Sequence, residues 1–338
     1  MRLRPNNLHG LDALRALLDD AVTLVENEPI DSPKLPPLLK PMDLFDRIAA
    51  PGRGVVMTMG KGGVGKTTVA AALAVTLALR GHKVFLSTTD PAAHVATTLA
   101  GELPNLIVSR IDPEVETRNY VRQVMANQGT DLDASSRALL EEDLRSPCTE
   151  EIAVFRAFAR TVAAGRDGFV ILDTAPTGHT LLLLDATEVY HRELGRQARE
   201  NVPEEVRELL PRLRDPHFTR VLLVTLPEAT PVHEAAALQA DLCRASIEPF
   251  AWVINQSVAL VTTTDPLLAE RGRREQPYFD EVVRSHSTRT TAFPWLVTEP
   301  IGLAALGRLF LVHPTTVAHP EPVKPFNLKS NENLNRQN

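Results

Sequence analysis

The chain has 338 residues, of which 43 % are hydrophobic and 23 % charged, and a formal net charge of -6 at pH 7. This composition excludes a disordered chain, and two cysteines exclude a disulfide scaffold. The acidic balance disfavours nucleic-acid binding, and no apolar run reaches the ~20 residues of a membrane span. We therefore expect a cytoplasmic globular protein with no nucleic-acid partner. The one dense basic cluster is interpreted as a solvated helix face; it comprises Arg271, Arg273 and Arg274, flanked by Glu270 and Glu275.

The two flanks of the chain differ from its middle. Residues 10–17 match residues 302–309, with Gly, Leu, Ala, Leu and a final Leu in the same register. This repeat predicts that residues 1–20 are the remnant helix of a preceding, related domain. The alternative is two unrelated amphipathic helices. Residues 21–53 predict a proline-rich extended linker, and residues 312–338 a disordered tail.

Between these flanks, residues 54–311 predict one domain in which short β-type runs alternate with helical patterns. Continuous apolar runs suit strands that are buried on both faces of a parallel sheet. The predicted class is therefore α/β, a mostly parallel sheet with helices on both faces. A helix is expected over residues 67–80, and another begins at Thr230 and Pro231. Strands are expected at residues 54–59, 83–88, 169–173, 220–225, 251–255 and 291–295.

A glycine-rich segment, GKGGVGKTT, lies between the first predicted strand and a helix, and fits G-x-x-x-x-G-K-[ST]. Its glycines let backbone N–H groups surround phosphates, while Lys66 reaches the β- and γ-phosphates and Thr67 ligates Mg2+. This pattern predicts a phosphate loop that binds ATP. The nucleotide-contacting residues are expected to be Gly60, Lys61, Gly62, Gly63, Val64, Gly65, Lys66, Thr67 and Thr68.

The second lysine of the loop, Lys61, stands at its entrance. A charge there does not easily fold back onto its own nucleotide, but it reaches the nucleotide of a facing subunit, as an arginine finger does in trans. We therefore expect a catalytic Lys61 and a dimer. The alternative is a solvated lysine in a glycine-rich loop.

Two aspartates follow predicted buried strands and should emerge at the ligand-binding edge of the sheet. Asp90 is placed to orient the attacking water, which makes it a candidate catalytic residue. Asp173 is suited to hold Mg2+ through its water shell. The alternative for each is a helix N-cap, and the neighbouring phosphate loop favours catalysis.

Three segments carry a resemblance to a known family. Residues 60–68 resemble the deviant Walker A motif shared by septum-site and partition ATPases, nitrogenase iron protein, tail-anchored-protein-targeting ATPases and arsenical pump-driving ATPases. Residues 87–94 and 173–180 resemble the two switches of the last two members. The resemblance covers the predicted domain and implies that Asn255 reads adenine and that Pro294 lies near the base.

A fourth segment, residues 144–153, resembles the arsenical pump-driving ATPases, specifically the second of their two homologous halves. In that family the cysteine binds trivalent arsenic or antimony, helped by a serine and a histidine. The resemblance implies a metalloid site at Ser146, Cys148 and His191, completed by another half or copy, and thiolate suits such an ion. A lone cysteine otherwise reads as a small buried hydrophobe, which is our interpretation of Cys243.

The family implies an ATPase that couples ATP hydrolysis to arsenite or antimonite extrusion through a membrane efflux pump, with the metalloid stimulating hydrolysis. The alternative is an ATP-dependent targeting chaperone for tail-anchored membrane proteins. That role calls for a methionine-rich surface and, in many members, a C-x-x-C zinc clasp. Five methionines and two distant cysteines disfavour it.

One departure concerns size, because the two-half members are longer than this chain. The sequence predicts one nucleotide site here, so a second nucleotide-binding half is expected as a partner. A truncated product, a fragment with a separately encoded first half, and a homodimer all remain open.

Overall fold

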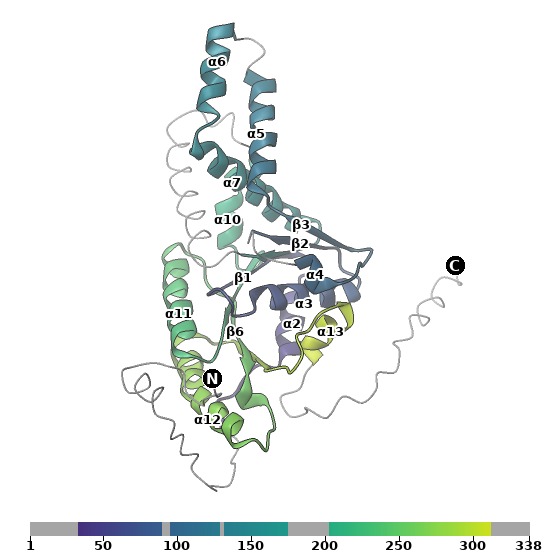
Figure 1. The fold of residues 1–338 in the computed structure, drawn as a ribbon, viewed down its shortest axis with the longest axis vertical. Helices are drawn as coiled ribbons and strands as arrows, with labels where there is room; N and C mark the ends of the chain where they lie inside the picture. The colour runs from purple at the N-terminus through teal and green to yellow at the C-terminus, as the bar shows by residue number, and fades with distance from the viewer. Residues whose placement is uncertain (1–32, 90–94, 129–131, 175–202, 312–338) are drawn as a thin grey trace, which may run out of the picture.

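A computed structural model describes residues 33–89, 95–128, 132–174 and 203–311 (Figure 1). The expected remnant helix at residues 1–20 and the expected tail at residues 312–338 lie outside these described residues. Two candidate site residues, Asp90 and His191, also lie outside them.

A parallel sheet forms the centre of the molecule. Within the described residues it has seven strands in the order β3-β2-β4-β1-β5-β6-β7, and every neighbouring pair is parallel. This confirms the predicted class. The strands are β1 (Gly54–Met59), β2 (Val84–Thr88), β3 (Leu106–Arg110), β4 (Phe169–Asp173), β5 (Thr219–Thr225), β6 (Ala251–Ser257) and β7 (Thr290–Pro294). Only β3 was not predicted, because this edge strand exposes most of its side chains and lacks a long apolar run.

Helices cover both faces of the sheet, as Figure 1 shows. Neighbouring residues of one strand serve different cores, because successive side chains point to opposite faces. Val56 belongs to the core cluster that includes residues of α2, α3 and α13, whereas Val55 belongs to the cluster that includes residues of α7, α10 and α11. The longer helices are α2 (Pro41–Ala49), α3 (Lys66–Leu79), α5 (Pro113–Gln128), α6 (Ala134–Asp143), α7 (Pro147–Ala163), α11 (Ala229–Arg244) and α12 (Pro266–Glu281). The shorter ones are α4 (Val95–Leu99), α9 (Glu204–Arg207), α10 (Leu209–Arg214) and α13 (Leu303–Arg308).

The predicted extended linker over residues 21–53 is wrong for residues 41–49, which form α2. Pro41 begins this helix, where its missing N–H costs nothing. Leu44, Phe45 and Ile48 are fully buried against the core. The surrounding prolines concealed this short apolar stripe in the sequence.

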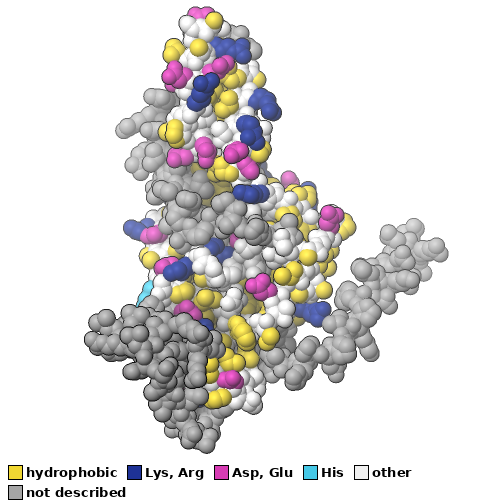
Figure 2. Space-filling view, in the orientation of Figure 1, with side chains coloured by type: hydrophobic (Ala, Val, Ile, Leu, Met, Phe, Trp, Pro, Cys, Tyr) yellow, Lys and Arg dark blue, Asp and Glu magenta, His cyan; other side chains and the backbone are white. Residues whose placement is uncertain are grey.

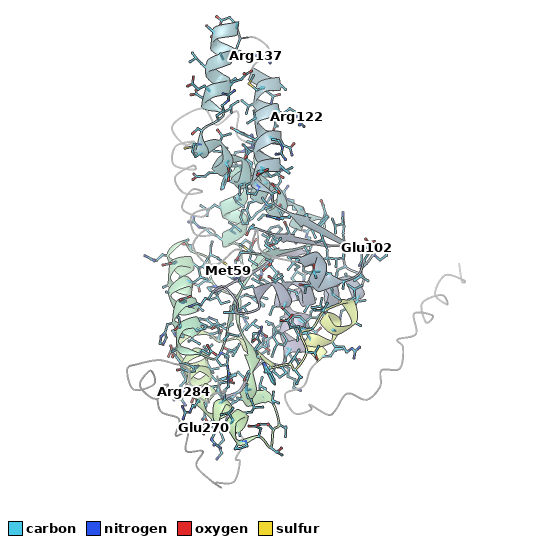
Figure 3. All side chains as sticks on the ribbon, in the orientation of Figure 1. Met59, Glu102, Arg122, Arg137, Glu270 and Arg284 are labelled. Carbon is cyan, nitrogen blue, oxygen red and sulfur yellow. The ribbon has the colours of Figure 1, made fainter. Side chains whose placement is uncertain are left out.

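Helices α5 and α6 project away from the sheet (Figures 1 and 3). None of the residues of α6 is buried, whereas α5 packs on α7 near the base of the projection. Figure 2 shows charged and hydrophobic side chains interspersed over the surface of these projecting helices. Across the described ranges, no helix combines the length and apolar character needed to span a bilayer.

Phe45 provides a test of the packing of α2. Its buried ring contacts Phe310 with 5.6 Å between ring centroids. Phe45→Ala should lower the free energy of unfolding by about 3–5 kcal/mol in urea denaturation, because it leaves a cavity. Val297→Ala, at a residue that is 86 % exposed, should change it by less than about 0.5 kcal/mol. Equal effects of the two substitutions would show that α2 does not stabilise the fold.

Candidate functional site

The predicted phosphate loop connects β1 to α3, the strand–loop–helix setting that such a loop requires. Gly60 and Gly65 have positive φ angles. A Cβ at Gly60 would lie 2.2 Å from the carbonyl oxygen of Val224, and one at Gly65 would lie 2.2 Å from Nδ2 of Asn255. Both positions therefore require glycine, because the loop runs directly against the ends of β5 and β6.

Lys66 begins α3 and its side chain folds back over this loop. The residue is buried, and Nζ donates a hydrogen bond to the carbonyl oxygen of Lys61 at 3.0 Å. The ammonium group thus lies within the curve of the loop. This is where phosphate oxygens would need a cation.

Asp173 ends β4 and meets the phosphate loop at the same edge of the sheet. Oγ1 of Thr67 donates to Oδ2 of Asp173 at 2.7 Å, although the two residues are 106 positions apart. Thr58 and Thr88 also donate to this carboxylate, at 3.5 and 3.4 Å. The strand register places them there, since Asp173 pairs with Thr58 of β1 and Thr88 of β2.

The donor set of Thr67 and Asp173 fits Mg2+. Magnesium prefers oxygen ligands and is commonly held by one or two carboxylates together with waters and substrate phosphates. Elsewhere in the described part of the chain, no group of three or more His, Cys, Asp or Glu side chains could hold a metal. Asp173 is 1 % exposed, so its orientation is fixed by the sheet.

The chain leading to Asp90 also runs beside Asp173. The backbone N–H of Thr89 donates to the carbonyl oxygen of Asp173 at 3.0 Å. Asp90 itself lies outside the described residues. Thr89 is therefore held at the edge of the sheet where the sequence predicts that Asp90 acts.

Lys61 has a partner that the sequence did not suggest. Its Nζ lies 2.7 Å from Oε1 of Glu234 on α11, and both side chains are more than a third exposed. Exposed ion pairs contribute only about 0–1 kcal/mol. Lys61 is thus neither a fully solvated lysine nor firmly anchored.

Asn255 lies near the end of β6 and is buried against the phosphate loop. Its Nδ2 donates to the carbonyl oxygen of Val64 at 3.0 Å. The next residue, Gln256, has a φ of 54°, which is an uncommon backbone conformation for a residue other than glycine. Pro294, at the end of β7, is also buried and pairs with Ser257.

A cavity of about 290 Å³ opens beside these residues. Its wall includes Gln256 and Trp295, the immediate neighbours of the predicted Asn255 and Pro294. The described residues that line it are Leu226, Pro227, Glu228, Gln256, Val258, Leu268, Arg271, Glu275 and Trp295. Apolar side chains combined with a few polar groups are typical of a small-molecule site. None of these wall residues was among the nucleotide contacts predicted from the sequence.

Glu275 of α12 holds the turn after β6 in place. The residue is 5 % exposed, and its carboxylate accepts hydrogen bonds from Oγ of Ser257 at 2.7 Å and from the N–H groups of Val258 and Ala259 at 3.1 and 3.0 Å. The solvated-face interpretation is therefore wrong for this residue. Glu270, by contrast, forms exposed ion pairs with Arg273 and Arg274.

Cys148 is exposed at the first turn of α7. Ser146 is the N-cap of this helix, since its Oγ accepts from the N–H of Cys148 at 3.3 Å, and Pro147 occupies the first helical position. The structure brings Ser146 and Cys148 together and excludes the buried-hydrophobe interpretation of this cysteine. Cys243 is half-buried on α11, and burial, followed by Glu248, raises the pKa of its thiol.

Comparison with known proteins gives a consistent result. The family model for "Anion-transporting ATPase" matches residues 53–202. The "Arsenical pump-driving ATPase" of Escherichia coli is 49 % identical over 91 % of this chain and 52 % of its own length. The chain thus spans about half the length of that relative. The "Putative arsenical pump-driving ATPase 2" of Aquifex aeolicus is 31 % identical over 66 % of this chain and 86 % of its own length. "ATPase GET3A" of Arabidopsis thaliana is 28 % identical over 77 % of this chain and 85 % of its own length.

The burial of Glu275 predicts a pH effect. Desolvation raises the pKa of this carboxyl, opposed by its hydrogen bonds and by Arg271. A raised pKa means that the folded chain holds the proton more tightly than the unfolded chain, whose Glu titrates near about 4.3. Glu275 therefore adds to the free energy of unfolding below about pH 4.3, and this contribution is lost as the pH rises through the pKa of the folded state.

The stability of Glu275→Gln relative to the parent chain should therefore increase with pH across this window. Urea denaturation of both chains between pH 4 and pH 8 measures the difference, in which the other titrating groups cancel. A difference that decreases with pH would show that the hydrogen bonds outweigh desolvation.

Proposed function

Because the chain belongs to the anion-transporting ATPase family, we propose that its phosphate loop binds ATP with Mg2+ and hydrolyses the γ-phosphate. The observation that carries this proposal is the 2.7 Å hydrogen bond between Thr67 and Asp173. It joins the phosphate loop to the acidic end of a neighbouring strand, which is the arrangement that Mg–ATP chemistry requires.

Each site residue then has a defined task. Lys66 contacts the β- and γ-phosphates from within the loop, and the backbone N–H groups of residues 60–68 surround the phosphates. Thr67 and Asp173 would hold Mg2+, which would offset the negative charge of the phosphates. Asp90 accepts a hydrogen bond from the attacking water and orients it toward phosphorus.

The cavity beside Asn255 is proposed to hold adenine. Gln256 and Trp295, which directly follow Asn255 and Pro294 in the chain, contribute to its wall. Glu275 fixes the turn that carries Gln256. A base in this cavity and a triphosphate in the loop would be joined across Gly65, which lies beside the Asn255 amide.

Hydrolysis is proposed to drive arsenite or antimonite extrusion through a membrane efflux pump, from the cytoplasmic side. The similarity to the Escherichia coli relative, which is named an arsenical pump-driving ATPase, supports this role. Ser146, Cys148 and His191 would supply part of a metalloid site. The exposed thiol at the start of α7 suits such a site, because thiolate is a good ligand for soft ions.

A second nucleotide-binding half would complete the assembly, as a second copy or a separate chain. Lys61 would then act in trans on the facing nucleotide, as in a deviant Walker A site. Its exposed pairing with Glu234 is weak enough to break when the halves close.

The alternative function is a targeting chaperone for tail-anchored membrane proteins. One observation favours it, since Leu139 on α6 is 64 % exposed and α6 buries none of its residues. The higher identity to arsenical pump-driving ATPases than to the Arabidopsis thaliana ATPase supports the first proposal.

Asp90→Asn tests the catalytic assignment. ATP should still bind, because the phosphate loop is intact, while turnover should fall by about 100-fold or more through loss of water positioning. Lys66→Ala should abolish binding instead. Fluorescent-nucleotide titration and steady-state phosphate release measure the two effects, and normal turnover in Asp90→Asn would remove this residue from the mechanism.

The same variant examines the trans role of Lys61. Mixing Asp90→Asn chains with Lys61→Ala chains creates one intact composite site in a dimer, so part of the activity should return. No recovery from mixtures that sediment as dimers would contradict the trans assignment.

Antimonite stimulation tests the metalloid site. The ratio of ATPase activity with and without antimonite should exceed one for the parent chain and return to one in Cys148→Ser and His191→Ala. A tenfold ratio corresponds to about 1.4 kcal/mol of differential affinity for the closed state. Cys243→Ser is the matched control and should keep the parent ratio. Equal stimulation of Cys148→Ser and the parent chain would rule out this thiol as a ligand.

A further inference from the structure

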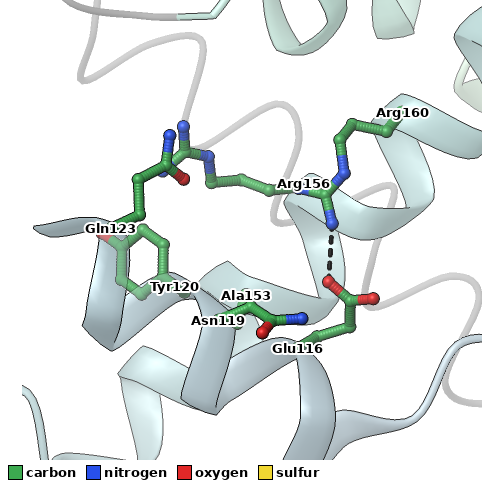
Figure 4. A pocket seen from close by; sticks show the side chains of 7 residues that line it. All are labelled: Glu116, Asn119, Tyr120, Gln123, Ala153, Arg156 and Arg160. Atoms are coloured by element: carbon green, nitrogen blue, oxygen red, sulfur yellow. Dashed lines mark hydrogen bonds and ion pairs between the residues drawn. The ribbon is translucent and has the colours of Figure 1, made fainter.

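A cavity of about 260 Å³ lies between α5 and α7, at the base of the projecting helices and apart from the nucleotide site. Figure 4 shows the side chains that surround it. Four residues from α5 and three from α7 form the lining: Glu116, Asn119, Tyr120, Gln123, Ala153, Arg156 and Arg160.

The spacing of these residues explains why a cavity forms here. On α5 the lining residues recur at intervals of three and four, so they share one face of the helix, and those of α7 do the same. Packed helix faces are normally apolar, but these two faces are mostly polar. Ala153 is 2 % exposed, and its small side chain leaves the space that a larger residue would fill.

The charges around the cavity do not cancel. Arg160 donates to Glu116 at 2.6 Å, which makes a neutral pair. Arg156 is half-buried and extends across the cavity toward Gln123, with its guanidinium 5.2 Å from the ring centroid of Tyr120. Within the part of the chain that the structure describes, Arg156 forms no ion pair with a carboxylate. The described lining residues therefore carry one net positive charge.

We propose that this cavity binds a small hydroxycarboxylate through Arg156. A planar guanidinium matches a carboxylate in a bidentate pair, and stacking on Tyr120 restricts its orientation. One net positive charge compensates a monoanion, whereas it would leave the second charge of a dianionic phosphate unpaired. The amides of Asn119 and Gln123 offer donors and acceptors for the ligand hydroxyl.

A carboxylate could also come from a glutamate or aspartate side chain of another protein. The buried floor at Ala153 and a volume of about 260 Å³ between the two helices favour a free small molecule. The two sources are separated by comparing lactate with N-acetylglutamate amide, which mimics a glutamate side chain within a peptide.

The experiment is isothermal titration calorimetry of the full chain without nucleotide, at constant ionic strength, with sodium lactate, N-acetylglutamate amide and inorganic phosphate. We expect saturable binding of one lactate per chain, with phosphate at least tenfold weaker. Arg156→Met should weaken lactate binding by at least tenfold. The lactate affinity of Arg156→Lys should lie between those of the parent chain and Arg156→Met, because lysine keeps the charge and loses the planar fork.

Two further variants complete the design. Ala153→Leu should abolish binding by filling the cavity, and Arg118→Met is the matched control, since Arg118 lies on α5 but pairs with Glu114 outside the cavity. No lactate binding by the parent chain, or equal binding by Arg156→Met and the parent, would overturn the proposal. So would binding of N-acetylglutamate amide alone. If Ala153→Leu does not fold, the Arg156 series decides. Because the nucleotide is absent, the result is independent of the proposed ATPase activity.

Discussion

The buried carboxylate of Asp173 is the constraint on which the rest of the site depends. An ionised group away from water is costly unless hydrogen-bond donors surround it, and here Thr58, Thr67 and Thr88 provide them. Those donors come from β1, the first turn of α3 and β2. The parallel register of β4 with both neighbouring strands is therefore tied to the position of the phosphate loop, and disturbing either one would leave a buried charge without its partners.

Two glutamates of the site differ in burial, and the buried one holds its hydrogen-bond partners more rigidly than the exposed one. Glu275 is buried with three donors, so losing any of them leaves an unsatisfied group, and the turn that follows β6 is held rigidly. Glu234 meets Lys61 at the surface, where water replaces either partner at little cost. The wall of the cavity beside Asn255 is thus preorganised, whereas the lysine at the entrance of the loop can exchange partners.

The sequence predicted the features that are encoded locally. Central strands such as β1 and β4 are continuous apolar runs because both of their faces are buried, and the loop glycines form one contiguous motif. Features that depend on distant contacts were missed. The partner of Lys61 is 173 residues away, and the burial of Glu275 depends on a turn 16–18 residues earlier. In the sequence, this glutamate beside an arginine cluster is indistinguishable from a solvated one.

Helix α7 connects the proposed metalloid thiol to the sheet. Its first turn is capped by Ser146, which fixes the backbone of Cys148. Just beyond its other end, Gly165 lies so close to β1 that a Cβ there would be 2.8 Å from Val55. The helix has 17 residues and is about 25 Å long. The cap fixes only the local backbone of its first turn, whereas the contact at Gly165 ties its far end to the sheet. Completing the proposed metalloid site around Cys148 would require a partner half to approach as a body, and under the proposed trans role the same motion would bring a second nucleotide toward Lys61.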